Sequence, residues 1–297
     1  MISPTTPRAG LAQIGPALLG ASSFACADVL AKVVLNAGAD VLTLSAIRGV
    51  LGLAILYAWL RLNPRPDFPP RARWISLGLG VLFAGNVFLL FKAFETVPVP
   101  IAILTYFVYP LLTGLAAAAT GLEKITWRGA LAAVAAFLGL MLMIGAHPTS
   151  LALVGILGAL AAACCRVVML LVTRATLQGT DALQITWYSM ISSSALFVAA
   201  ALAAWHWQPP ATALGWVGLI VLSVAVMTGI LGVFSSTGRI GPFRTALFMN
   251  LEPLLATIGS ALFLGEFITP PQAFGGDRKS TRLNSSHTMT SRMPSSA

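Results

Sequence analysis

Six charged side chains fall inside long apolar segments of the chain, and they are the groups best able to do chemistry. In chain order they are Asp28, Lys32, Arg48, Lys92, Arg166 and Glu252. A charge at the centre of a membrane helix costs about 2.5–3.5 kcal/mol on insertion scales. Each of these residues is therefore expected to pair with another charge, to hold a proton or to bind a polar ligand.

Asp28 has two candidate partners. Lys32 lies about one helical turn later on the same face, so the two charges could neutralise one another. Asp28 and Arg166 occupy matching positions, 138 residues apart, in the two halves of an internal repeat described below. Residues at equivalent positions of inverted repeats lie at similar depths, so this acid and base could also pair between the halves. The sequence leaves open both pairings, and also the absence of any pairing.

Two prolines mark the other candidates. Pro110 and Pro253 interrupt apolar segments at equivalent places, and each removes a backbone hydrogen bond and frees a carbonyl about one turn earlier. Paired interruptions of this kind point to the binding site of a transporter. Both segments carry stripes of small or polar residues that ordinary helix packing also explains. Tyr106, Tyr109 and Glu252 are the members of those stripes that we expect to contact a ligand.

The remaining polar residues differ in their expected roles. Arg48 could extend to the nearer membrane surface, but that surface has no other cations, which favours a role inside the helix bundle. Arg166 lies deeper in its segment and is harder to explain by such an extension. Glu123 and Glu266 fall at predicted helix ends, so we expect them to fix helix termini or loops.

The composition identifies the class of protein. Hydrophobic residues make up 57% of the 297 residues and charged residues only 9%, with a mean hydropathy of +0.87. A soluble domain carries about 25% charged residues and could not hide this much apolar surface from water. The sequence therefore predicts an all-α integral membrane protein embedded in a lipid bilayer. It excludes a disordered chain, a coiled coil and a water-soluble globule.

Metals, cofactors and nucleic acids are not expected as partners. The three cysteines lie in apolar runs and the three histidines are scattered, so no metal-ligand spacing is present. The net charge is +9 and the isoelectric point about 10.2. Lys and Arg nevertheless occur singly or in short loops, which favours control of topology over nucleic-acid binding. An enzyme would need a catalytic dyad, paired aspartates or a metal cluster, and none is evident.

Nine segments are long and apolar enough to cross a bilayer, which takes about 20 residues. They cover 11–36, 41–60, 73–94, 99–120, 128–146, 150–173, 182–204, 211–234 and 243–264. These runs are too long, and alternate too little, to be membrane strands. With a cytoplasmic N-terminus, every loop Lys or Arg falls inside, because the connections 37–40, 95–98, 147–149 and 205–210 contain none. We therefore predict a cytoplasmic N-terminus.

The chain contains a weak internal repeat. A shift of 143 residues superimposes Pro110 on Pro253 and Glu123 on Glu266. Five helices per unit is an odd number, so the second unit must insert upside down relative to the first. We predict a first unit over 1–146 and a second over 147–276 that lacks its last helix. The fold class is thus a ten-helix, 5+5 inverted repeat, here truncated to nine helices.

The last segment, 277–297, is polar and unlike the rest of the chain. Its letters DRKSTRLNSSH and SRMPSSA are those obtained by translating the constant parts of a common short-read sequencing adapter. We therefore expect this tail to be non-native and assign no function to it. In its place, the source gene is expected to encode an apolar span of about 20 residues.

The motif residues of the two halves resemble those of a known family. They are Pro110, Glu123-x-x-Thr126 and Gly139 in one half, and Leu251-Glu252-Pro253 with Gly265-Glu266-x-x-Thr269-x-x-Gln272 in the other. Over about residues 11–276, the chain is similar to EamA-type members of the drug/metabolite transporter superfamily. The resemblance implies ten helices in two inverted repeats and export of small metabolites or drugs across the inner membrane.

From the residues and the resemblance together, we expect a secondary transporter that exports a small amino-acid-like or drug-like molecule. Coupling to protons is an option because Asp28 and Glu252 can titrate. The predicted substrate and coupling site comprises Asp28, Arg48, Tyr106, Tyr109, Arg166 and Glu252. A flippase for a lipid-linked sugar on the same fold and a non-transporting membrane scaffold are the alternatives. The sequence also leaves a homodimer open.

Overall fold

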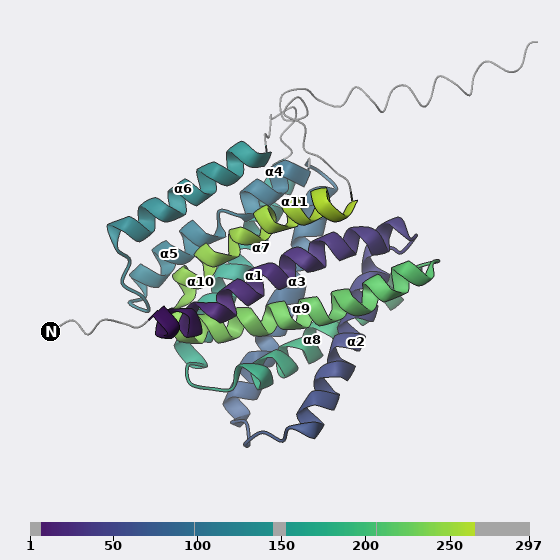
Figure 1. Cartoon of the computed structure of the whole chain (residues 1–297), viewed down its shortest axis with the longest axis horizontal. Coiled ribbons are helices and arrows are strands. Elements are labelled where there is room, and N and C mark those ends of the chain that lie inside the picture. The colour runs from purple at the N-terminus through teal and green to yellow at the C-terminus, as the bar shows by residue number, and fades with distance from the viewer. Residues whose placement is uncertain (1–6, 98, 145–152, 206, 265–297) are drawn as a thin grey trace, which may run out of the picture.

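The computed structural model describes residues 7–97, 99–144, 153–205 and 207–264, and all the regular structure in those ranges is α-helical (Figure 1). The helices are α1 (Pro7–Asn36), α2 (Val41–Leu62), α3 (Pro70–Phe94), α4 (Val99–Tyr106), α5 (Tyr109–Ala119), α6 (Trp127–Ile144), α7 (Leu153–Thr176), α8 (Ala182–Ala203), α9 (Ala213–Ile240), α10 (Pro242–Met249) and α11 (Leu251–Leu264). The predicted boundary between the two units at 146, the end of the second unit and the polar tail lie outside the described residues.

Most of these helices are long and apolar enough to cross a bilayer. Eight segments of the described chain meet that description, and part of α6, Trp127–Met141, adds a shorter apolar helix. Two of the eight segments are interrupted: one contains α5 and the end of α4, and the other contains α10 and most of α11. The prediction of a multi-pass, all-α membrane protein with nine spans is therefore confirmed for the described part of the chain.

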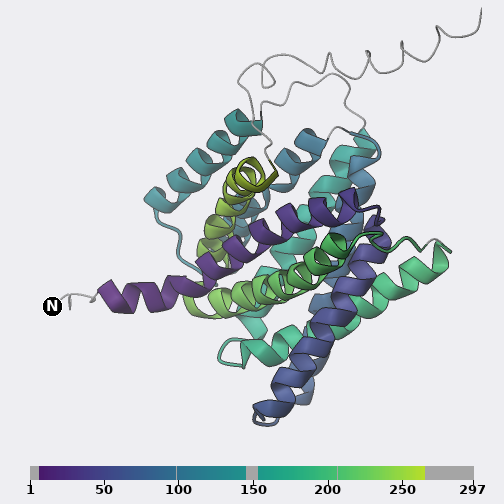
Figure 2. The ribbon, with the colours of Figure 1, turned by 45° about the vertical axis from the view of Figure 1, so that its right-hand side comes forward.

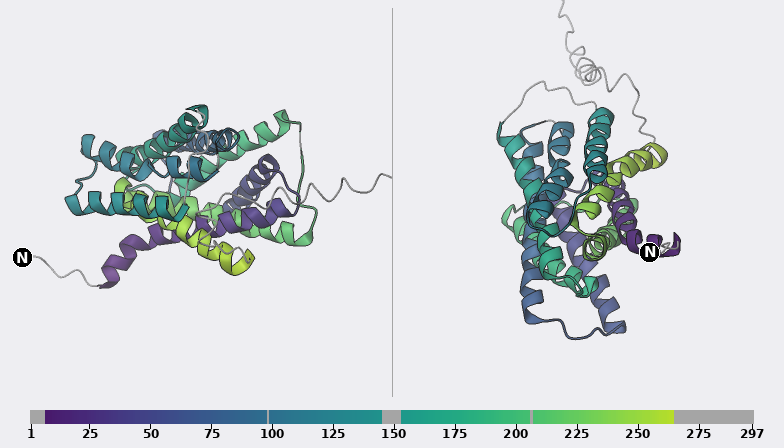
Figure 3. Two further views of the ribbon diagram at one scale, coloured as in Figure 1. Left: turned by 90° about the horizontal axis from the view of Figure 1, so that it is seen from above. Right: turned by 90° about the vertical axis from the view of Figure 1, so that its left-hand side faces the viewer.

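The helices pair as two inverted repeats require. In this comparison α1, α2 and α3 of the first half correspond to α7, α8 and α9 of the second. The repeat equivalent of the contact between α1 and α9 is then the contact between α7 and α3. Both of these pairs are extensive, and α1 runs along α9 in two views (Figures 1 and 2). In the same way, the contact between α2 and α9 is equivalent to the contact between α8 and α3. The contact between α2 and α8 is its own equivalent, and all of these helix pairs touch. Helices α1 and α11 lie against one another on one side of the bundle (Figure 3).

Small residues allow these pairs to approach closely. A Cβ added to Gly232 of α9 would lie 2.7 Å from the carbonyl oxygen of Pro16 and 2.8 Å from the backbone nitrogen of Gly20, both on α1. A Cβ on Gly80 of α3 would likewise collide with the backbone oxygen of Ser189 on α8. In a membrane, where helices gain little from burying apolar surface against one another, this close backbone packing supplies much of the attraction.

The two prolines interrupt their helices at equivalent places. Helix α4 ends at Tyr106 and α5 begins at Tyr109, directly before Pro110, while α10 ends at Met249 and α11 begins just before Pro253. Proline has no N–H to donate, and its ring clashes with the carbonyl four residues earlier. The expected interruptions are therefore present, and each starts a new helix partway along an apolar segment (Figure 1).

Two aspartates at matching positions begin the second helix of each half. Asp40 accepts hydrogen bonds from the N–H groups of Leu42 at 2.8 Å and Thr43 at 3.0 Å, which are orphan donors of the first turn of α2. It also accepts a bond of 3.1 Å from the backbone N–H of Gln208, in the connection between α8 and α9. One carboxylate thus joins a loop of the first half to a loop of the second.

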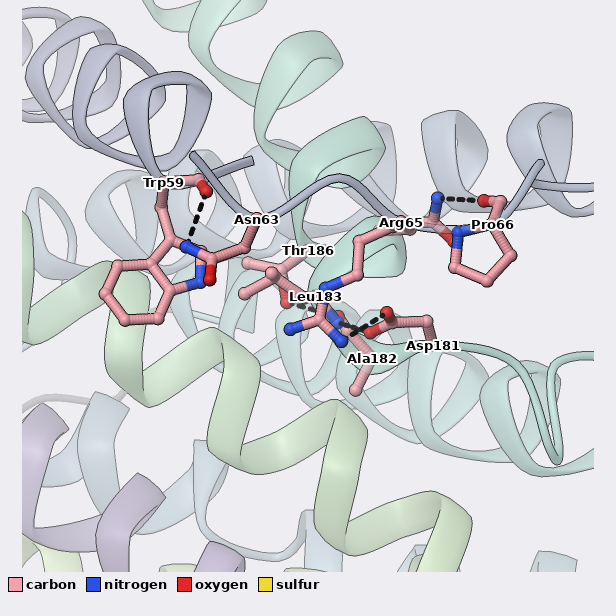
Figure 4. Close-up of polar contacts among 9 residues, drawn as sticks. Trp59, Asn63, Arg65, Pro66, Asp181, Ala182, Leu183 and Thr186 are labelled. Carbon is pink, nitrogen blue, oxygen red and sulfur yellow. Dashed lines mark hydrogen bonds and ion pairs between the residues drawn. The ribbon is translucent and has the colours of Figure 1, made fainter. Parts of the chain in front are cut away.

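Asp181 does the same at the start of α8. It accepts a bond of 2.8 Å from the N–H of Leu183 and pairs with the guanidinium of Arg65, 3.3 Å away, in the α2–α3 loop. Figure 4 shows Asp181 beside Arg65 and Pro66 of this loop, and the side chain of Gln184 donates to the carbonyl of Pro66 at 2.8 Å. The loop of one half is therefore held against the helix start of the other, which fixes how the halves meet.

Candidate functional site

The predicted site residues come from six different helices. Asp28 is on α1, Arg48 on α2 and Arg166 on α7. The tyrosines flank the α4–α5 break and the remaining acid begins α11, and these residues are Tyr106, Tyr109 and Glu252. Electrostatic interactions connect all six residues, so the folded chain gathers them into one network in the bundle interior.

Arg166 is the centre of this network. The residue is only 6% exposed, and its guanidinium lies 5.7 Å from the ring centre of Phe24 and 5.9 Å from that of Tyr109. It interacts electrostatically with Tyr106, Tyr109 and Glu252. Aromatic faces stabilise a desolvated cation, so Arg166 can remain charged deep in the bundle without a full shell of water.

Glu252 lies in the first turn of α11 because the chain breaks after Met249. This position favours an acid, since the unpaired N–H groups at a helix start attract negative charge. Glu252 interacts with Arg166 and with the second acid, Asp28. The helix break thus brings two carboxylates and a guanidinium from three helices together.

Asp28 interacts with Arg48 of α2, which was not among the candidate partners proposed from the sequence. The guanidinium of Arg48 also lies 5.7 Å from the ring centre of Phe197 on α8, so this arginine points into the bundle. Asp28 keeps solvent-accessible surface, and Arg48 and Glu252 keep some, although surrounding protein atoms desolvate all three side chains. This combination is expected of groups that line a space between helices rather than the outer surface.

Asn86 is a member of the network that the sequence analysis missed. It is buried on α3, donates a bond of 2.7 Å to the carbonyl of Ala162 on α7, and interacts with the Tyr106 hydroxyl. An amide inside an apolar span is itself a signal, because such groups hydrogen-bond between membrane helices. Ser189 and Ser193 of α8 were also missed, and with Arg166 they line a small cavity between the helices.

Two other charged residues lie away from the network. Lys92 at the end of α3 forms an exposed ion pair with Glu95, with 3.0 Å between Nζ and Oε1. Glu123 was expected to hold a helix terminus, and it accepts a bond from the first turn of α10. Its repeat counterpart Glu266 lies outside the described residues.

Within the described ranges, no three His, Cys, Asp or Glu side chains gather as metal ligands would.

An all-α multi-pass bundle with paired helix breaks and a buried charged network between them is the architecture of a membrane transporter. The EamA-like transporter family model matches residues 13–145 and again 153–276. The chain therefore belongs to the EamA-like transporter family, within the drug/metabolite transporter superfamily. Membership in this family identifies a multi-pass membrane transporter.

Similar proteins agree with this assignment. The threonine/homoserine exporter RhtA of Escherichia coli K12 is 28% identical over 237 residues, which cover 77% of this chain and 75% of that protein. The protein of the same name from Escherichia coli O157:H7 matches equally. A solved crystal structure superimposes with a TM-score of 0.73 at 19% identity, covering 88% of this chain and 94% of the other. At that identity the structural likeness establishes the fold alone.

Proposed function

We propose that this protein exports a small zwitterionic metabolite of the amino-acid type across the bacterial inner membrane. The observation that carries the proposal is the network between the two helix breaks, in which carboxylates and guanidinium groups face one another. An amino acid carries both an ammonium and a carboxylate group. Glu252 and Asp28 can hold the first, and Arg166 can hold the second through charge-assisted hydrogen bonds.

The relatives support the choice of an amino acid. RhtA is named as an exporter of threonine and homoserine, and both compounds present one ammonium, one carboxylate and a short side chain. The aromatic rings of Tyr109 and Phe24, which flank Arg166, leave little room around the charged groups. A small substrate therefore fits this site better than an extended one.

Proton exchange is the coupling that this arrangement supports. Asp28 and Glu252 interact, and two neighbouring carboxylates resist being ionised together. A proton on one of them and the ammonium of a substrate would relieve the same repulsion, so the two would compete for the site. Competition of this kind, combined with alternating access of the two halves, exchanges an outgoing substrate for an incoming proton.

The test is transport by the purified chain in proteoliposomes. We expect a pH gradient to drive movement of radiolabelled L-threonine or L-homoserine. Glu252→Gln keeps the shape of the side chain but cannot ionise, so it should abolish transport or remove its pH dependence. Lys92→Gln, which alters an exposed ion pair away from the network, is the matched control and should leave the rate unchanged. Transport by Glu252→Gln at the parent rate with the parent pH dependence would contradict the proposal.

A further inference from the structure

The two ends of the helix bundle differ in how closely the interrupted helices approach one another. Helix α5 of the first half packs against α10 of the second. Because Pro110 lies at the start of α5 and Pro253 at the start of α11, the repeat equivalent of this contact lies between α11 and α4. Within the described residues, α4 and α11 scarcely touch. The interrupted helices are therefore closed on one another at one end of the bundle and apart at the other.

Polar contacts hold the closed end together. The side chain of Glu123, which is only 11% accessible, accepts a bond of 2.9 Å from the backbone N–H of Phe243 and pairs with Arg244. A Cβ added to Gly241 would lie 2.5 Å from Oε2 of Glu123, and Gly241 has a positive φ of 96°. A glycine is needed there both for the turn and for the close approach of the carboxylate. The start of α10 is thus shaped to receive this acid from the other half.

An aromatic ring fills the space beneath these polar contacts. Phe243 is 4% exposed, and its ring lies against glycines of α5 and α6. A Cβ added to Gly114 would lie 2.9 Å from the ring, and one added to Gly129 would lie 3.2 Å from it. The ring therefore packs directly on the backbone of the first half. Such a contact excludes water from this end of the bundle.

Other contacts between the halves are present at both ends. Asp40 joins the start of α2 to the connection between α8 and α9, and Asp181 joins the start of α8 to the α2–α3 loop. These two contacts are repeat equivalents, one at each end of the bundle. An inverted repeat reaches its opposite-facing state when the halves exchange their conformations. The paired contacts persist through such an exchange, whereas α5 must separate from α10 as α4 closes on α11.

We propose that Glu123, Phe243 and Arg244 form the inner gate of the transporter, and that this gate must open in every transport cycle. With a cytoplasmic N-terminus, the contact between α5 and α10 lies at the cytoplasmic end, so the structure is closed to the cytoplasm. The proposal rests on alternating access and on the predicted orientation, and it holds whatever the substrate is.

A thiol placed behind the gate reports its opening. Ala246 is fully buried on α10, three residues after Phe243, and belongs to the same apolar cluster as Tyr109. Ala246→Cys is made in the full chain without its native cysteines, and an impermeant maleimide is added to inside-out membrane vesicles. Loss of a helix-capping contact shifts an equilibrium by about 2- to 30-fold. We therefore expect Glu123→Ala to speed labelling of this thiol by about threefold or more. Glu123→Gln, which keeps an acceptor, should stay closer to the parent.

Phe243→Ala removes the ring instead of the polar contacts and should also speed labelling, so the test does not depend on one variant. Asp40→Ala is the matched control, because it removes a helix-capping acid that joins the halves at the opposite end. It should label at the parent rate, and gel filtration establishes that each variant is folded. Unchanged labelling in both gate variants, or an equal increase in Asp40→Ala, overturns the gate. An increase seen in intact cells but not in inside-out vesicles overturns its assignment to the cytoplasmic end.

Discussion

The carboxylate of Glu123 accepts a hydrogen bond of 2.9 Å from the backbone N–H of Phe243. Glu123 lies in the loop between α5 and α6, whereas Phe243 is in the first turn of α10, so the bond joins the two halves. Arg244 adds an ion pair, with 3.5 Å between its Nε and Oε1 of Glu123. Glu123 therefore stabilises the N-terminus of α10, the helix that precedes α11 and Glu252. It also holds this N-terminus against the first half of the chain.

The first prediction concerns the stability that this contact provides. Glu123→Ala removes the acceptor for the α10 N–H and should lower the free energy of unfolding by about 0.5–2 kcal/mol, as for other helix caps. Glu123→Gln retains an acceptor and should lose less. Thermal unfolding in detergent measures both changes. Equal losses in the two variants would show that the charge, rather than the hydrogen bond, is the stabilising feature.

The same residue predicts a dependence on pH. Burial raises the pKa of Glu123 above its ordinary value, although the N–H of Phe243 and the charge of Arg244 act in the opposite direction. A raised pKa means that the folded state holds the proton more tightly than the unfolded state. The stabilisation is complete below the ordinary pKa and is lost as the pH rises through the folded value. As the pH rises above the ordinary pKa of a glutamate, about 4.3, the parent should show this decline and Glu123→Gln should lack it.

Local chemistry made much of the fold predictable. The spans follow from long apolar runs, and the helix breaks follow from Pro110 and Pro253, whose missing N–H acts within one turn wherever the helix packs. The charged residues of the site could be chosen because charge inside an apolar run is costly in any arrangement. These inferences needed no knowledge of which helices touch.

Pairing between helices was not predictable in the same way. Both faces of α1 are largely apolar, so its sequence does not fix its rotation or show that Asp28 interacts with Arg48 on a neighbouring helix. Ser189 and Ser193 resemble ordinary small packing residues until α7 places Arg166 beside them. The sequence does not predict these contacts because each one depends on the orientation of a neighbouring helix.

A second acid should give the opposite response to pH. Burial would raise the pKa of Asp40, but hydrogen bonds from Thr43, Gln208 and Leu42 outweigh it and hold the pKa below its ordinary value. Its stabilisation is therefore complete above the ordinary pKa and lost as the pH falls through the folded value. We expect the parent to lose thermal stability below about pH 4 and Asp40→Ala to lose less over that range. Asp67→Ala, which removes a carboxylate from an exposed position, should follow the parent.

The orientation in the membrane gives a fourth prediction. In a variant without the native cysteines, Asp67→Cys places a thiol in the α2–α3 loop and Ala211→Cys places one before α9, and both positions are exposed. With a cytoplasmic N-terminus, the first thiol is inside and the second outside. In intact cells, an impermeant thiol reagent should label Ala211→Cys and spare Asp67→Cys until the cells are opened. The reverse pattern would overturn the orientation.

The last prediction tests whether Asp28 and Arg48 act as a pair. Removing one charge of an interacting pair leaves the other uncompensated, whereas replacing both by neutral groups does not. Asp28→Asn and Arg48→Gln should therefore each destabilise the chain more than Asp28→Asn/Arg48→Gln does. The coupling from the double-mutant cycle, measured by unfolding in detergent, should exceed about 1 kcal/mol.

The matched control for this cycle is the exposed pair Lys92–Glu95, whose side chains are 54% and 61% accessible. Water screens such a pair, so its coupling should be about 0–1 kcal/mol. If the Asp28–Arg48 coupling is no larger than this, the two charges do not compensate one another in the folded chain. Asp28 would then have to obtain its counter-charge elsewhere, and the distribution of charge that assigns the ammonium of a substrate to Asp28 and Glu252 would have to be revised.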